Sequence, residues 1–240
     1  MGWLDLQRVP EPEVMDECGE VEAYSSAAAQ SYLSQVDDTF VDHARRLVTS
    51  PIDAEVAGTV LDIGTGPGQI ALKLAQQLSG WPVIGVDRSP NMIRQALAAR
   101  DAAPTAQQRP GAKAAELEFL VADAKRLPFP DASFDLVLCN SVLHHLEDPA
   151  SLLAEIARVA GPDGAILLRD LRRPSRLAYP YHVRWYGRHY LGTMYRLYCD
   201  SVRAAYTPDE LSAMLSRSPL RDARVFRHSS THLGIERAVR

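Results

Sequence analysis

Cysteine is scarce in this sequence of 240 residues. The three cysteines, Cys18, Cys139 and Cys199, lie far apart, and no pair has the spacing of a metal-binding or redox motif. An odd number of cysteines also argues against a framework of disulfide bonds. We therefore expect reduced thiols, and the sequence predicts no metal site.

Long hydrophobic runs are absent as well. No apolar stretch approaches the roughly 18 residues that a membrane-crossing helix needs, and the N-terminus lacks the basic stretch and apolar core of a secretory signal. Hydrophobic residues still make up 46% of the chain, which is enough for a substantial core. These features predict a cytoplasmic protein without a membrane span, built as one large domain with appendages, as a monomer or homodimer.

Positively charged residues are scarce in most of the chain and concentrated in its last third. Up to Leu168 the sequence has 12 Lys and Arg against 24 Asp and Glu, whereas from Arg169 onward it has 14 Arg against 6 acidic residues. The net charge is only −4. Strong nucleic-acid binders show a dominating positive field, so a nucleic-acid partner is disfavoured.

The hydrophobic pattern changes along the chain. In an N-terminal part, residues 1–57, apolar residues at helical spacing from Tyr24 to Val48 predict one amphipathic helix. Residues 58–171 alternate short apolar runs with helical segments, which is the pattern of βαβ units in a parallel sheet. The predicted strands are 59–63, 83–86, 117–121, 134–139 and 165–169, and the predicted helices are 68–78, 90–99 and 149–159.

Residues 172–206 break this regularity. The stretch 172–203 holds seven Arg, six Tyr and one Trp, and we expect a helical insertion there. In the last part, residues 207–240, an N-cap motif at Thr207 opens a helix, and two closing strands are predicted at 223–228 and 233–238. The predicted fold class is therefore α/β, with a doubly wound, mostly parallel sheet of seven strands and a helical insertion after strand five.

The strongest motif joins the first predicted strand to its helix. The run VLDIGTGPG, from Val60 to Gly68, is an apolar strand that leads into a Gly-x-Gly-x-Gly turn. Glycines let a ligand approach the backbone where a side chain would clash, and the following helix offers free N–H groups. The second strand ends near Asp87, where a carboxylate could accept hydrogen bonds from a ribose diol. Gln69 stands where a nicotinamide fingerprint needs its last glycine, so that cofactor is disfavoured.

At these residues the chain resembles the class I S-adenosylmethionine-dependent methyltransferases, especially the small-molecule group that includes ubiquinone and menaquinone biosynthesis methyltransferases. The resemblance spans roughly residues 59–169 and implies a Rossmann-like fold that binds S-adenosylmethionine and releases S-adenosylhomocysteine. In that family the turn after the first strand holds the methionine end of the donor, which implies Asp62, Gly64, Thr65, Gly66 and Gly68. The acid that ends the second strand holds the ribose and the residues after it border the adenine, which implies Asp87, Arg88 and Met92.

Two later segments extend the resemblance. The run VADA at 121–124 looks like the family's adenine-binding strand end, with Asp123 accepting from the adenine amino group and Ala124 giving a backbone donor. The run CNSVLHHL after the fourth strand resembles the loop that borders the donor in this family. The resemblance therefore implies that Asn140 and the backbone near Ser141 face the sulfur and carboxylate of the donor.

The acceptor side carries fewer signals. Methyl transfer from a sulfonium is an in-line displacement, so aligning the acceptor and excluding water supply much of the acceleration. If the acceptor must lose a proton, the candidate bases are His144, His145 and Asp170. We favour His145 over its neighbour, with Asp170 as a second candidate, because adjacent histidines cannot both face one pocket in a regular element. Related enzymes place an N-terminal helix over the donor as a lid, where Tyr24 and Tyr32 would either cap the site or pack in the core.

The leading hypothesis is methylation of a small-molecule acceptor, with oxygen, carbon, nitrogen and sulfur all open as the acceptor atom. The basic, aromatic segment 172–203 keeps methylation of RNA or protein as an alternative, because arginine and tyrosine also stack on nucleic acid. A donor-binding protein that has lost catalysis is a third alternative, because intact donor motifs say nothing about turnover.

Overall fold

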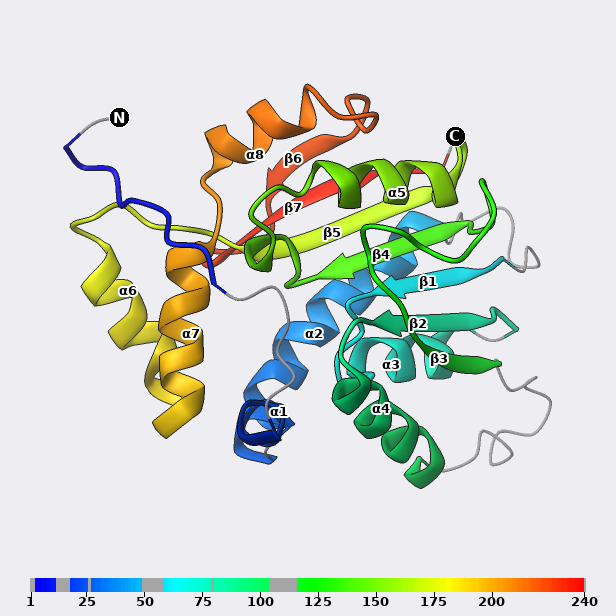
Figure 1. Cartoon of the computed structure of the whole chain (residues 1–240), viewed down its shortest axis with the longest axis horizontal. Coiled ribbons are helices and arrows are strands. Elements are labelled where there is room, and N and C mark those ends of the chain that lie inside the picture. Colours follow the sequence, from blue (N-terminus) through cyan, green and yellow to red (C-terminus); the bar gives the residue numbers. More distant parts are fainter. Residues whose placement is uncertain are drawn as a thin grey trace.

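The computed structural model describes residues 3–11, 18–25, 27–48, 58–78, 80–103 and 116–239, with backbone alone for residues 18, 20, 25 and 27–32. Within these ranges a single sheet runs through the molecule and helices cover both of its faces (Figure 1). The sheet confirms the predicted α/β fold class, with the strand order β3-β2-β1-β4-β5-β7-β6. Its strands are β1 (Val60–Ile63), β2 (Val83–Asp87), β3 (Leu117–Val121), β4 (Leu136–Asn140), β5 (Ala165–Leu171), β6 (Arg224–Arg227) and β7 (His232–Arg237).

The pairing of the strands is mostly parallel. Strands β1 to β5 pair in parallel, whereas β7 lies antiparallel between β5 and β6. The chain order reverses between β1 and β4, because β2 and β3 lie on one side of β1 and the later strands lie on the other. In doubly wound sheets this reversal opens a crevice at the carboxyl ends of the strands, where ligands bind.

Alternate residues of the central strands supply two apolar cores. In β4, Leu136 and Leu138 belong to the core beneath α2 (Ala27–Val48), α3 (Gln69–Gln77) and α4 (Pro90–Ala102). Val137 and Cys139 belong to the opposite core, beneath α5 (Ala150–Ala160) and α8 (Pro208–Leu215). A strand buried on both faces needs an unbroken apolar sequence, which explains why these strands read as continuous hydrophobic runs.

The N-terminal part differs from the prediction of one helix from Tyr24 to Val48. The structure has two helices, α1 (Cys18–Ser25) and α2, and Tyr24 lies on the first of them. Phe40 and Ala44 of α2 are fully buried, so the apolar spacing predicted the packed face correctly. Apolar periodicity alone could not place the break between the helices, because residues on both sides of it are compatible with helix.

The boundaries of two strands also shift. Strand β4 begins at Leu136, later than predicted, because the backbone N–H of Phe134 donates to the carbonyl of Val159 near the end of α5 (3.1 Å) and not to a neighbouring strand. Strand β5 continues to Leu171, beyond the predicted end at 169, because β7 pairs with it along that length.

After β5 the chain forms α6 (Tyr179–Tyr186), η3 (Gly187–His189) and α7 (Gly192–Ala204) beside the carboxyl end of the sheet (Figure 1). These helices share a third apolar core that includes Leu171, Val183 and Val202. Residues 3–11 run along α7, where the backbone N–H of Val9 donates to the carbonyl of Arg203 (3.3 Å). No helix among the described residues is long and apolar enough to cross a membrane.

Candidate functional site

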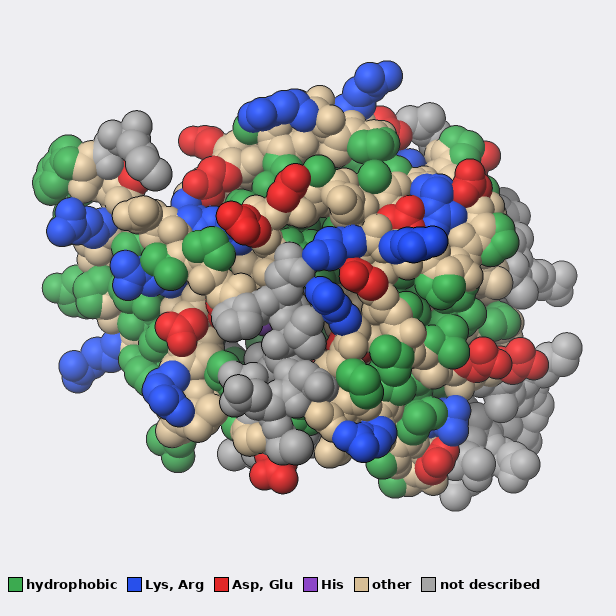
Figure 2. Space-filling view, viewed as in Figure 1, with side chains coloured by type: hydrophobic (Ala, Val, Ile, Leu, Met, Phe, Trp, Pro, Cys, Tyr) green, Lys and Arg blue, Asp and Glu red, His purple; other side chains and the backbone are tan. Residues whose placement is uncertain are grey.

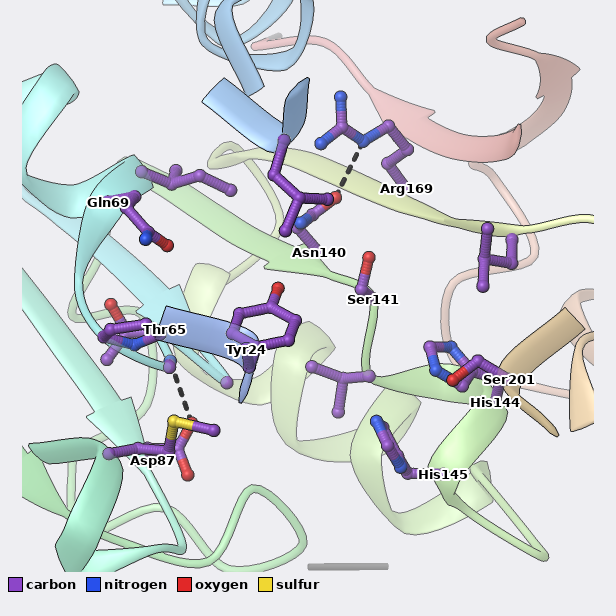
Figure 3. Close-up of a pocket in the computed structure, with 18 of the residues that line it drawn as sticks. Tyr24, Thr65, Gln69, Asp87, Asn140, Ser141, His144, His145, Arg169 and Ser201 are labelled. Carbon is purple, nitrogen blue, oxygen red and sulfur yellow. Dashed lines mark hydrogen bonds between the residues drawn. The ribbon is translucent and has the colours of Figure 1, made fainter. Parts of the chain in front are cut away.

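One large pocket lies where the chain order reverses, at the carboxyl ends of β1, β2, β4 and β5. Figure 3 shows its two ends, with Thr65, Gln69 and Asp87 on one side and His144, His145 and Ser201 on the other. We call the first the donor end and the second the acceptor end. The donor end is lined mainly by the turn after β1 and by the segments that follow β2 and β3, whereas later segments supply most of the acceptor end.

The glycine turn after β1 forms one wall of the donor end. Gly64 and Gly66 both have left-handed backbone, with φ of 69° and 53°. A Cβ on Gly64 would lie 2.2 Å from Val142 Cγ2, whereas a Cβ on Gly66 would meet no protein atom within 4 Å. Gly64 therefore allows close packing, and Gly66 borders open space where a ligand can approach the backbone. This space suits the expected donor.

Two residues expected to bind the donor do not line the pocket. Gly68 also has left-handed backbone (φ 84°), but its absent Cβ leaves room for Phe119, whose Cζ would lie only 2.7 Å away. Asp62 is buried beneath the turn, where its carboxylate accepts a hydrogen bond from Thr65 Oγ1 (2.7 Å). Burial raises the pKa of Asp62 to about 7. Both residues shape the turn, and Thr65 reaches the pocket in their place.

Asp87, at the end of β2, holds the turn and faces the pocket. One carboxylate oxygen, Oδ2, accepts from the backbone N–H of Gly66, and the other, Oδ1, accepts from that of Ser89 (both 2.9 Å). Each carboxylate oxygen can accept more than one hydrogen bond, so hydroxyl groups of a ribose can still be bound there. Met92, in the first turn of α4, is buried and supplies an apolar wall beside it.

The expected adenine-side residues line the same end. Asp123 Oδ1 accepts from the backbone N–H of Lys125 (2.9 Å), which orients the carboxylate. Arg88 Nε lies 3.9 Å from Asp123 Oδ2, at the edge of the pocket, and both side chains are largely exposed to solvent. Ala124 also lines the pocket. The structure thus brings Asp87, Arg88, Asp123 and Ala124 together as the resemblance implied.

Arg169 organises the centre of the pocket from a fully buried position on β5. Its Nε donates to Asn140 Oδ1 (2.7 Å), and its Nη2 pairs with Asp37 of α2 (3.0 Å). The Asn140 oxygen is therefore engaged, and its amide N–H groups are the polar hydrogens available to a ligand. Ser141 follows with left-handed backbone (φ 59°), and its N–H donates to the Arg169 carbonyl (2.8 Å). Such a conformation in a residue other than glycine is strained and typical of functional sites.

Of the two tyrosines expected to cap the site or pack in the core, the structure places one in the pocket. Tyr24 lines the pocket from α1, and Figure 3 shows its ring between the two ends. Burial raises the pKa of Tyr24 well above its usual value. The side chain of Tyr32 lies outside the described residues. A capping role for Tyr24 therefore stays a prediction that its position supports.

The acceptor end contains a network of two histidines and two acids. His144 Nδ1 lies 2.6 Å from Asp170 Oδ1, and His144 Nε2 lies 3.2 Å from Glu11 Oε1. His145 Nδ1 lies 3.1 Å from the same Glu11 oxygen, and the Ser201 hydroxyl donates to that carboxylate (3.1 Å). Four segments far apart in the sequence therefore meet in this network, through Glu11, the two histidines, Asp170 and Ser201.

Charge stabilises this network. Burial alone would lower the pKa of His144, but the carboxylates of Asp170 and Glu11 raise it to about 10. Burial raises the pKa of both acids, and the hydrogen bonds and charge of His144 outweigh it, so both pKa values lie below the usual ones. His144 is therefore an imidazolium held between two carboxylates.

The expectation that only one histidine can face the pocket is wrong. Both His144 and His145 line it, with ring centroids 4.3 Å apart. They lie on η2 (Leu143–His145), a single turn of 3-10 helix, where successive side chains are not forced onto opposite faces as they are in a strand. Asp170 lies behind His144 and does not line the pocket. It is placed to position His144, and not to touch an acceptor.

The same cluster contains side chains of the types that bind metal ions. Among the described residues, Glu11, His144 and His145 offer three ligand atoms within 4.8 Å of one another. A metal requires an imidazole nitrogen without its proton. Both carboxylates raise the pKa of His144, so a metal ion at this cluster would have to displace a proton from that imidazole.

Apolar and aromatic side chains form the outer wall of the acceptor end. They come from β5, α6 and α7, and from the short segments between the helices. Aromatic side chains favour stacked or edge-on contacts with a flat ring, so the chemistry of this wall suits such a ring. The residues are Leu171, Tyr186, Tyr190, Met194, Leu197 and Tyr198.

Sequence reasoning missed Glu11 and Arg169 altogether. Glu11 lies in a segment whose acidic composition gave no periodic signal, and only its fold-back onto α7 brings it to the histidines. Arg169 did carry a signal, because an arginine at the end of an apolar strand must find partners when it is buried.

Comparisons with known proteins identify the family of this chain. A family model described as a methyltransferase domain matches residues 61–168. The demethylmenaquinone methyltransferase of Deinococcus radiodurans is 30% identical over 227 residues, which cover 89% of this chain and 90% of that protein. A ubiquinone/menaquinone biosynthesis C-methyltransferase of Desulfotalea psychrophila is 31% identical over 164 residues, which cover 68% of this chain and 61% of that protein.

Among solved structures, the plantazolicin methyltransferase BamL, in complex with a triazolic desmethylPZN analog and SAH, is similar in fold. The TM-score is 0.58 at 15% identity, over 87% of this chain and 69% of that one. At this level of identity, the likeness concerns the fold alone.

Proposed function

We propose that the acceptor of this chain, which belongs to the class I S-adenosylmethionine-dependent methyltransferases and methylates a small molecule, is an aromatic ring bearing a hydroxyl group, of the quinol type. The observation that carries this proposal is the acceptor end itself, where an apolar and aromatic wall faces two histidines. A flat ring fits the wall, and a ring hydroxyl fits the histidines. The Deinococcus relative is named for demethylmenaquinone, a quinone whose reduced quinol form carries ring hydroxyl groups of this kind.

The donor end supports binding of S-adenosylmethionine. The open space at Gly66 admits the methionine part, Asp87 can accept from the ribose hydroxyls, and Asp123 and Ala124 lie where adenine needs polar partners. When bound, S-adenosylmethionine supplies a methyl group on a sulfonium. The acceptor attacks this methyl group as the C–S bond breaks, and the electron pair of that bond stays on the sulfur. The residues of this chain then have to orient the acceptor and remove its proton.

His145 is the proposed base. It lines the pocket, and an imidazole that takes the hydroxyl proton becomes a cation beside the Glu11 carboxylate, 3.1 Å away. Loss of that proton puts electron density on the ring oxygen and on the neighbouring ring carbons, so either atom becomes a better nucleophile. Asp170 is a positioning residue, because it acts only through His144.

The division of the chain into the four parts predicted from the sequence is also a proposal. Residues 58–171 and 207–240 would form the donor-binding core, while 1–57 and 172–206 would build the acceptor end and cover the site. The contacts of Glu11, Tyr24 and α7 with the pocket support this division. Covers of this kind exclude water from the reaction.

We further propose a cytoplasmic location and a monomeric or homodimeric state. Cys139 is buried and Cys199 half-buried, and both are free thiols, as a reducing compartment would keep them. Light scattering on a sizing column measures the oligomeric state directly.

The acceptor class is tested with deuterium-labelled donor and a panel of soluble acceptors. The panel contains naphthoquinols, simple phenols, primary amines and thiols, and mass spectrometry reports which of them gains the labelled methyl group. We expect the quinols and phenols to be methylated and the His145→Gln variant to lose this activity. Methylation of amines or thiols with none on the hydroxylated rings would overturn the proposal.

A further inference from the structure

The outer face of α6 carries large apolar side chains in contact with solvent. Leu177, just before the helix, is 60% exposed, Tyr181 is 78% exposed and Trp185 is 64% exposed. They recur every four residues, so they form one row along the helix surface. The described surface elsewhere exposes few side chains of this size, and a row of three is more than scattered apolar exposure.

The N-terminal segment extends this row. The carbonyl of Leu4 accepts a hydrogen bond from the backbone N–H of Arg176 (2.9 Å), which places Leu4 beside the start of α6. Trp3 is 78% exposed, and Leu4 is also exposed. Figure 2 shows apolar side chains and arginines gathered at the left of the molecule, where Figure 1 places α6. We call this surface the outer patch, made of Trp3, Leu4, Leu177, Tyr181 and Trp185.

Positive charge surrounds the outer patch. From 171 to 199 the sequence has six arginines and no Asp or Glu. Arg176, Arg184 and Arg188 are exposed, and none of the ion pairs found between described residues includes any of them. The Arg188 guanidinium lies over the Trp185 ring, 4.5 Å from its centroid. The rest of the chain is acidic overall, so this charge is local.

The other face of the same helix belongs to the active site. Val183 is buried in the core between α6 and α7, and Tyr186 lines the acceptor end of the pocket. Tyr181, Arg184 and Trp185 point away from it, into solvent. A surface that binds through the outer patch would therefore lie directly behind the wall of the acceptor pocket.

We propose that the outer patch docks on the surface of a membrane that contains anionic lipids. Tryptophan and tyrosine favour the boundary between headgroups and acyl chains, because their rings are apolar with a polar edge. Arginines beside them attract anionic headgroups and can extend along the apolar surface to reach them. An amphipathic helix with this arrangement lies in the plane of the interface. The segment 172–203, read from sequence as a possible nucleic-acid surface, has a better partner in a lipid surface, because its exposed rings are combined with leucines.

The test measures binding of the full chain to vesicles by flotation. Vesicles of phosphatidylcholine alone are compared with vesicles that also contain phosphatidylglycerol. We expect binding to the anionic vesicles, weakened by salt. Each arginine near an anionic surface contributes about fivefold, so changing Arg176, Arg184 and Arg188 together to Gln lowers the affinity on the order of 100-fold. A control that changes the exposed Arg46, Arg217 and Arg221 to Gln has the same net charge and should stay within about twofold.

The apolar part of the contact has its own pair of variants. Tyr181→Ser with Trp185→Ser should weaken vesicle binding about tenfold or more, and high salt should not mask the loss. Leu120→Ser with Val121→Ser, on the exposed edge strand β3, is the matched control and should bind as the parent does. Equal binding of the arginine variant and its control would overturn the proposal, as would failure of the parent chain to bind anionic vesicles at low salt.

Two other occupants of the patch appear as distinct outcomes. A dimer that the Tyr181 and Trp185 variant dissociates, without vesicle binding, would assign the patch to a second copy of the chain. Salt-dependent RNA binding without vesicle binding would assign it to nucleic acid. Methylation of a water-soluble acceptor is measured in every variant and should not change. The vesicle assay contains no acceptor, so the docking proposal can fail while the proposed acceptor class stands. In the same way, the proposed acceptor class can fail while the docking proposal stands.

Discussion

The donor end and the acceptor end of one pocket are built in different ways. The donor end comes mainly from consecutive strand ends, and much of its contact surface is backbone, held by the glycine turn and Asp87. The acceptor end is lined by side chains from η2, β5, α6 and α7, and Glu11 of the N-terminal segment contacts its two histidines. A common donor can be bound by a common backbone arrangement, whereas each acceptor needs its own side chains. Mutations at the two ends should therefore separate donor affinity from turnover.

The largest expected effect is at the acceptor end. His145→Ala should lower kcat about 10²- to 10⁴-fold, because the proposed base is lost, while calorimetry should find the affinity for S-adenosylhomocysteine within about threefold, under 1 kcal/mol. His189→Ala, at an exposed position on η3, is the control. A normal kcat in His145→Ala would remove the base from the mechanism.

At the donor end, two glycines should separate binding from packing. Gly66→Val places its branches in the open space of the pocket, so we expect donor affinity to fall about 30-fold or more, equivalent to about 2 kcal/mol. Gly68→Ala instead meets Phe119 and should mainly lower the melting temperature. Equal donor affinity in Gly66→Val and the parent would show that the turn does not contact the donor.

Asp87→Ala tests the carboxylate that holds both the turn and the ribose. Removing a charged acceptor of two backbone hydrogen bonds should weaken donor binding about tenfold or more. The exposed Asp101→Ala is the control, and calorimetry measures both affinities. If Asp87→Ala affected only kcat, the division of labour between the two ends would be wrong.

Beneath the turn, Asp62 should make stability depend on pH. Its pKa is raised by burial to about 7, above the ordinary value of 3.8, so folding favours the protonated form. The stability that this group contributes is complete below about pH 4 and is lost as the pH rises through about 7. Asp62→Asn should therefore gain stability relative to the parent across that window, by more than about 1 kcal/mol, the equivalent of one pKa unit. Urea unfolding without donor at both ends of the window measures the gain, and a constant difference would contradict it.

The smallest effect is expected for Glu11→Gln. This change keeps the shape of the side chain but removes the charge that would stabilise protonated His145, so kcat should fall about 3- to 10-fold. Donor affinity should not change. Glu22→Gln, on the exposed surface of α1, is the matched control. A fall in donor affinity would show that the N-terminal segment serves both ends of the pocket.

The donor end could be read from the amino-acid sequence because its parts are local. A glycine turn, an acid at the end of the next strand and a buried apolar run each act over a few residues, and parallel strands bring their ends to one edge. The same locality explains the errors there. Asp62 and Gly68 lie in the motif, but whether a residue in a turn faces the ligand or the core depends on what packs beneath it, here Thr65 and Phe119.

The residues of the acceptor end could not be predicted from the sequence, because only the folded chain brings them together. Nothing near Glu11 or Arg169 in the sequence shows their partners, because Glu11 meets histidines far along the chain and Arg169 meets Asp37 on α2. The two histidines share one pocket because a single 3-10 turn replaces a regular element at that point. Periodicity therefore predicted the fold, and short motifs with the family resemblance predicted the donor end. Contacts between distant segments of the chain placed the side chains that face the acceptor, and these contacts form only when the chain folds.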